Sequence, residues 1–169
     1  MRFAAVAFVA GGLLVLPSQL GESALNPVLD LVVVIVVVAV GVLCDMVGVA
    51  STRAKEQPFL SRAAKRAPGA RQSLHLVRHA DRVATVMSDL VGDTMGTVAG
   101  ALAAAMAVHL AEPRSIAAVT ALAVGVLSGV TVGLKALAKY VAVHRAQSVV
   151  ALAGRVLQTI GFDPPRAKG

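Results

Sequence analysis

Aromatic side chains are almost missing from this chain: they make up 3% of it, with no Trp and one Tyr, Tyr140. The aromatic belt that anchors many membrane proteins at the lipid surface is therefore nearly absent. The single Cys44 excludes an intramolecular disulfide and a cysteine-based metal motif. Charged residues amount to only 15%, against 57% hydrophobic residues, which excludes an ordinary soluble domain. The composition predicts an integral membrane protein.

The first apolar stretch lies within residues 1–25 and is the shortest. It carries Gly11, Gly12 and Pro17, and it only just reaches the length of about 20 residues that a bilayer-spanning helix needs. Arg2 followed by a short apolar run also fits a signal peptide. We predict an N-terminal transmembrane helix here, with the signal peptide as the open alternative.

Three longer apolar stretches follow, at about 28–50, 83–110 and 116–137. Asn26 and Pro27 are typical of a helix cap and a first helical position at the start of the first of them. Its Val-rich run resembles a buried strand in composition, but its length favours a helix. We therefore predict an all-α integral membrane protein with four spans.

Lys and Arg are distributed unevenly around these spans, which predicts the orientation. Two regions carry nearly all of the basic residues outside the spans, while Arg114 is the one basic residue between the last two spans. We expect a multi-pass protein of a bacterial-type inner membrane, with both termini in the cytoplasm. The net charge of +7 then serves topology and anionic lipid headgroups, and we expect no nucleic-acid binding. The basic residues of the two regions are Arg53, Lys55, Arg62, Lys65, Arg66, Arg71, Arg78 and Arg82, and Lys139, Arg145, Arg155, Arg166 and Lys168.

Two cytoplasmic segments alternate apolar and basic residues at helical spacing. Residues 58–82 predict two short helices broken at Pro68 and Gly69, and residues 142–160 predict a further helix. Such amphipathic juxtamembrane helices fit a position along the headgroups. Residues 163–169 predict a flexible tail.

Acidic residues inside the spans are the strongest functional signal. Asp89 and Asp93 are one helical turn apart within 83–110, so they share one side of the helix, and Asp45 lies near the end of the preceding span. A charge near the bilayer centre costs roughly 2.5–3.5 kcal/mol on insertion scales, so it usually faces a polar cavity, a cation or a protein partner. Carboxylate and hydroxyl oxygens suit Mg²⁺, which keeps several waters. The supporting hydroxyls are those of Ser51, Ser88, Thr94 and Thr97.

An alternative stays open for these acids, because Lys135 and Lys139 lie in and just beyond the last span. Asp45 or Asp93 could pair with either lysine, and the acids would then form a neutralised structural network instead of an ion site.

Glycines recur every fourth residue in two spans, which predicts close helix packing. The first ladder begins at Gly92, where a slackened helix could offer backbone carbonyls to an ion. Either both ladders pack inside one protomer, or one of them forms a homodimer seam. The remaining ladder residues are Gly96, Gly100, Gly125, Gly129 and Gly133.

The order of these features resembles the transmembrane domain of CorC-type and cyclin M (CNNM-type) magnesium transporters. In that family a Ser-rich span ending in a Glu motif precedes a basic helical hairpin and a span with a Gly-Asn-Asn motif. Asp45 falls at the family's Glu and Cys44 at a Ser, while Gly92 keeps the Gly and Asp93 replaces the first Asn. The segments that carry the resemblance are Gly41 to Arg53, Gly69 to Arg71, Leu76 to Thr85, Leu90 to Asp93, and Lys139 to Leu157.

The resemblance implies a three-span CNNM-like domain over 26–162 that follows the N-terminal span. It also implies Mg²⁺ as substrate, with Na⁺ as a possible coupling ion, and a homodimer. Two positions depart from the family, because Ala138 stands where it has Pro and Lys135 where it has an acid. We expect no paired cytosolic nucleotide-binding (CBS) modules.

Two functions follow. The first is binding or transport of Mg²⁺ or another hard cation through a pocket with Asp45, Asp89, Gly92 and Asp93 as ligands. The alternative is an accessory or structural membrane protein that docks lipid or a partner and transports nothing. We expect no enzyme and no organic cofactor, because no nucleophile with a neighbouring base and no phosphate-binding loop is visible.

Overall fold

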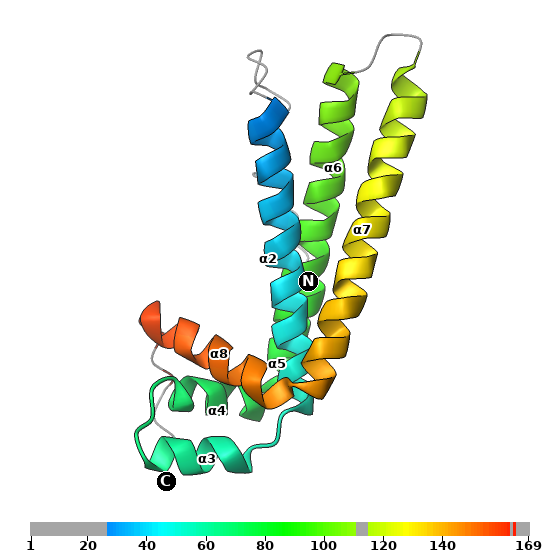
Figure 1. The fold of residues 1–169 in the computed structure, drawn as a ribbon. Helices are drawn as coiled ribbons and strands as arrows, with labels where there is room; N and C mark the ends of the chain where they lie inside the picture. The colour runs from blue at the N-terminus through cyan, green and yellow to red at the C-terminus, as the bar shows by residue number, and fades with distance from the viewer. Residues whose placement is uncertain (1–26, 111–114, 163, 165–169) are drawn as a thin grey trace.

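The computed structural model describes residues 27–110, 115–162 and 164, and every regular element within them is a helix. Three long helical rods lie side by side in Figure 1. The first rod is α2 (Pro27–Arg53) and the third is α7 (Ile116–His144). The second rod joins three segments end to end: α5 (Ala80–Ala84), the π-helix η1 (Thr85–Gly92) and α6 (Asp93–Leu110).

Three shorter helices gather at one end of the rods (Figure 1). These are α3 (Gln57–Ala64), α4 (Ala70–Arg78) and α8 (Ala146–Thr159), which we call the collar. The break between α3 and α4 contains Pro68 and Gly69, where the sequence predicts it.

All three rods are long and apolar enough to cross a membrane, as the sequence predicts for these segments. Many large apolar side chains of α2 and α7 are exposed in the single chain; Leu31, Val36, Leu122 and Leu137 are examples. Exposed apolar surface on this scale is unfavourable in water but suits a lipid environment. The chain is therefore consistent with a multi-pass membrane protein. The predicted first span lies outside the described residues.

The main core lies where the rods meet the collar. It contains Ala50 of α2, Phe59 of α3, Leu76 of α4, Ala142 of α7 and Val150 of α8, each at most 4% exposed. A smaller cluster joins α2 to α6 further along the rods, through Val34, Val38 and Ala99. Burial of these side chains fixes the collar against the ends of the rods.

The collar is also joined by polar contacts between α4 and the chain around α8. The Ser73 hydroxyl lies 2.9 Å from the Gly69 carbonyl oxygen and 3.1 Å from that of Val150. The Gln72 amide donates to the carbonyl of Phe162 at 3.0 Å. Gly69 has a φ of +72°, in the left-handed region, which directs the chain into α4.

Candidate functional site

Lys135 of α7 reaches across to the second rod and is held there by two oxygens. Its Nζ donates to Asp93 Oδ1 at 2.9 Å and to the carbonyl oxygen of Gly92 at 3.2 Å. The Lys135 side chain is 19% exposed, whereas the Asp93 side chain is 74% exposed. An ammonium group is thus bound by a carboxylate and a backbone carbonyl inside the length of the predicted spans.

Lys139 lies one helical turn after Lys135 and faces the other acid. Its Nζ is 3.6 Å from Asp45 Oδ2, and Asp45 as a whole residue is only 3% exposed. Asp45 Oδ2 has no hydrogen-bond partner among the described residues. The buried carboxylate is therefore balanced by an ion pair of moderate distance and keeps an oxygen free to accept.

The π-helix η1 positions the backbone part of this site. It ends at Gly92, whose carbonyl accepts from Lys135. π-Helical turns are rare and frequently occur at functional sites, because they release or redirect backbone groups. The sequence predicts a loosened helix at Gly92. In the structure the π-helix ends at Gly92, and α6 begins at the next residue, Asp93.

Glycines allow α2 to approach η1 closely. A Cβ added at Gly41 would lie 2.9 Å from Met95 Cβ and 3.3 Å from the Gly92 oxygen, and one at Gly48 would collide with Ser88 Oγ. A Cβ on Gly92 would lie 3.5 Å from Asp45 Cβ. Asp45 and the Gly92 backbone are therefore direct neighbours, as a shared pocket between the first two rods requires.

The other predicted ligands do not all join this cluster. Asp89 is exposed and forms no ion pair among the described residues. Ser51 is buried, but its hydroxyl donates to Val47 of its own helix at 2.8 Å. The Thr97 hydroxyl likewise donates to the Asp93 carbonyl at 3.0 Å. The hydroxyls of Ser51 and Thr97 thus bond within their own helices.

Ser88 connects the two rods more directly. Its hydroxyl donates to the backbone carbonyl of Asp45 at 3.4 Å, a long hydrogen bond between η1 and α2. Thr94, at the start of α6, is half-buried. Within the described residues, no group of three or more His, Cys, Asp and Glu side chains comes together. The candidate site therefore consists of two acids, a carbonyl and two lysines.

The predicted glycine ladders are mostly open in the single chain. Apart from the nearby backbone of its own helix, a Cβ on Gly100, Gly125, Gly129 or Gly133 would meet no atom of the described residues within 4 Å. One on Gly96 would meet Lys135 Nζ at 4.0 Å. The close contacts use Gly41 and Gly48 of α2 instead, which the sequence analysis did not single out. Gly41 and Gly48 are seven residues, or two helical turns, apart and so lie on the same side of α2. This spacing is the sequence signal that could have indicated a close helix contact.

His75 of α4 and His79, the residue directly after α4, are four residues apart, a spacing that can bind zinc, and their ring centroids lie 4.2 Å apart. Burial, together with the neighbouring His79, lowers the pKa of His75 below its usual value. A lowered pKa keeps the imidazole neutral near pH 7. No third ligand accompanies the pair among the described residues.

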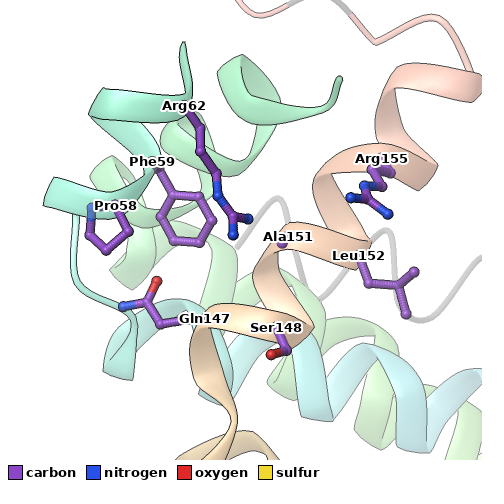
Figure 2. A pocket seen from close by; sticks show the side chains of 8 residues that line it. All are labelled: Pro58, Phe59, Arg62, Gln147, Ser148, Ala151, Leu152 and Arg155. Atoms are coloured by element: carbon purple, nitrogen blue, oxygen red, sulfur yellow. The ribbon is translucent and has the colours of Figure 1, made fainter. Parts of the chain in front are cut away.

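A hollow in the collar is a further feature that the sequence analysis missed. It lies between α3 and α8 and includes Arg62 and Arg155 in its lining (Figure 2). From the sequence, both arginines are predicted only to belong to the basic cytoplasmic segments. That α3 and α8 line one hollow cannot be predicted from either segment alone.

The chain matches no protein family, no characterised protein and no solved structure in comparisons with known proteins. The resemblance to CorC-type transporters therefore rests on the motifs alone.

Proposed function

We propose that this chain binds or transports Mg²⁺ or another hard cation at oxygens of α2 and of the η1–α6 junction. The observation that carries the proposal is the position of the Lys135 ammonium, on the Gly92 carbonyl and the Asp93 carboxylate. The Gly92 carbonyl and the Asp93 carboxylate are two of the groups that the sequence predicts as ligands of the ion. A site that holds an ammonium group offers the charge and the oxygens that a metal cation needs.

Lys135 and Lys139 act in this proposal as tethered cations that occupy the acids when no ion is bound. An incoming cation displaces the ammonium from Asp93, and the lysine returns when the cation leaves. Such exchange avoids an unpaired carboxylate at membrane depth, which is costly. Mg²⁺ keeps several of its six ligands as water, so the few protein oxygens here suffice. Asp45, whose buried Oδ2 forms the ion pair with Lys139 but no hydrogen bond among the described residues, is a further ligand or a gate.

The collar lies in the cytoplasm in this proposal, as the basic residues predict, and the membrane is a bacterial-type inner membrane. Na⁺ is a candidate coupling ion on the resemblance to CorC-type transporters.

A second copy of the chain completes the proposed assembly. The Asp93 side chain is 74% exposed and Asp89 is exposed, although both lie within a predicted span. The α7 ladder around Gly129 is open to a neighbouring helix. A homodimer would cover such surface and reduce the contact between carboxylates and lipid.

Flux into vesicles tests the proposal. The full chain is reconstituted into liposomes that enclose a Mg²⁺-sensitive dye, and Mg²⁺ is added outside. Asp93→Ala is expected to reduce uptake at least tenfold, because it removes the carboxylate that accepts the hydrogen bond from the Lys135 ammonium. Asp81→Ala, which removes an exposed acid of α5, is the matched control and should retain uptake. Unchanged flux in Asp93→Ala would remove this acid from the mechanism.

The accessory function has one specific observation in its favour: both Asp45 and Asp93 already have a lysine partner. In that case the ion pairs only hold α7 against the other rods. Liposomes with the wild-type chain would then take up no more Mg²⁺ than liposomes without protein. The same assay thus separates transport from the accessory function.

A further inference from the structure

The collar contains a hollow of about 330 Å³ between α3 and α8. Its apolar wall is made by Pro58, Phe59 and Leu152, and its polar wall includes Arg62, Arg155 and Ser148. Figure 2 shows Arg62 extending from α3 into the hollow toward α8, which contributes Ser148, Leu152 and Arg155. Two helices far apart in the sequence therefore build one recess with both an apolar and a cationic part.

The charge of the recess is one-sided. No Asp or Glu lines it, and neither Arg62 nor Arg155 forms an ion pair within the described part of the chain. The acid at the start of α3, Glu56, is already taken by Arg78 at 2.6 Å. Two guanidinium groups without a carboxylate partner favour an anionic ligand, and Arg binds phosphate oxygens especially well.

A second, smaller hollow of about 110 Å³ adjoins the first. The two share Phe59, Arg62, Ala151 and Arg155, so both arginines lie where the hollows meet. The smaller one also reaches Ser73, whose hydroxyl is already hydrogen-bonded to Gly69 and Val150. The space around the arginines is thus larger than either hollow alone.

An exposed apolar stripe leads away from the recess along α8. Leu152, at its edge, is followed one and two turns later by Val156 and Ile160, and these side chains are 61%, 49% and 74% exposed. Val149 and Val150 of the same helix are not part of this stripe, because both are buried against the collar core. Because α8 begins directly after the α7 rod, the stripe begins at Leu152, about two helical turns beyond the end of a helix that is long and apolar enough to span a membrane.

We propose that the recess binds the phosphate headgroup of an anionic phospholipid. Arg62 and Arg155 contact the phosphate oxygens, and the Ser148 hydroxyl is a further donor. The lipid tails lie along Leu152, Val156 and Ile160. The adjoining apolar stripe is what favours a lipid over a soluble phosphate compound, since a soluble ligand would leave this stripe uncovered. The inference is independent of ion transport.

The test is lipid binding by the full chain in a neutral detergent, measured by native mass spectrometry with phosphatidylglycerol and, separately, phosphatidylcholine. The double variant Arg62→Gln/Arg155→Gln is expected to bind phosphatidylglycerol roughly thirtyfold more weakly, since each of the two cations contributes about 1 kcal/mol to binding anionic lipid. Gln keeps much of the apolar stem. Arg71→Gln, which neutralises an exposed arginine of α4 outside the recess, should leave binding unchanged.

Three outcomes would overturn the inference. The first is equal phosphatidylglycerol binding by the double variant and by Arg71→Gln. The second is equal binding of phosphatidylcholine and phosphatidylglycerol by the wild type. The third is complete displacement of the lipid by excess inorganic phosphate, which would indicate a soluble phosphate ligand. If the Gln variant fails to fold, Arg62→Lys/Arg155→Lys keeps both charges but loses the forked geometry, and it is expected to bind severalfold more weakly than wild type. Full binding by this variant would contradict the assignment.

Discussion

Asp45 is 3% exposed, and its ion-pair partner among the residues that the structure describes is Lys139, with Nζ 3.6 Å from Asp45 Oδ2. A buried carboxylate that loses its counter-charge is more costly than the pair is favourable. Lys139 is therefore important for stability mainly because it prevents Asp45 from being left as a buried carboxylate without a counter-charge.

Lys139→Ala is expected to lower the free energy of unfolding by about 1–3 kcal/mol, the cost of leaving a buried polar group unpaired. The measurement is SDS-induced unfolding of the purified chain in mixed micelles, followed by helix content. In the double variant Asp45→Asn/Lys139→Ala the loss should largely disappear, since the charge itself is removed. Additive losses from the two substitutions would contradict the pairing.

Much of the residue-level site was predictable. The acids stood out because a carboxylate in an apolar span is costly, and Lys135 and Lys139 were named as alternative partners. Which lysine faces which acid was not predictable, because two lysines one turn apart present the same face and the choice depends on how the rods are offset.

At the scale of helices, close approach depends on a few glycines. A Cβ on Gly69 would lie 2.6 Å from the backbone N of Arg155, and Gly69 has φ of +72°. A Cβ on Gly154 would collide with Ser73 from the opposite side. The contact between α4 and α8 therefore has no room for a side chain at either glycine.

Gly69→Ala is expected to destabilise the collar by about 1–3 kcal/mol through overpacking, in addition to the roughly 1–2 kcal/mol cost of a left-handed alanine. Gly161→Ala is the matched control, because Gly161 has φ of +83° but an added Cβ would have no atom of the described residues within 4 Å. The control should therefore show only the smaller backbone cost. Thermal unfolding followed by circular dichroism measures both, and equal losses would show that the α4–α8 contact is not tight.

The long helices and the break at Pro68 and Gly69 were predictable from apolar run length and turn residues. The π-helix at Thr85–Gly92 was not, apart from the loosening expected at Gly92. A π-helical turn has no composition of its own; here it coincides with the close packing of η1 against Gly41 and Gly48 of α2.

For the whole molecule, the arrangement of rods and collar depends on contacts between distant residues. The Gln72 amide reaches the carbonyl of Phe162, and Ser73 reaches Val150. No local pattern encodes such pairs, so the recess between α3 and α8 could not be predicted. Charge and hydropathy predict how often the chain crosses the membrane but not which faces meet.

A substitution in the glycine ladder of α7 tests the proposed homodimer. Gly129→Leu is expected to weaken self-association about tenfold or more, because the side chain fills the groove that a second helix would enter. Ala117→Leu is the control, since it also adds a large side chain at an exposed position of α7. Ala117 lies about a third of a turn from Gly129 around the helix axis, and so on a different face. Energy transfer between labelled chains in vesicles measures association. Equal transfer in both variants would exclude this seam.

The most direct test of the cation site is the Mg²⁺ affinity of Lys135→Gln, measured by calorimetric titration of the purified chain. Removing the tethered ammonium from Gly92 and Asp93 is expected to tighten Mg²⁺ binding at least tenfold, and adding Asp93→Ala to this variant should abolish the gain. Mg²⁺ affinity that is unchanged or weaker in Lys135→Gln would contradict the site, because the lysine would then be a structural partner of Asp93 and not the occupant of a cation position.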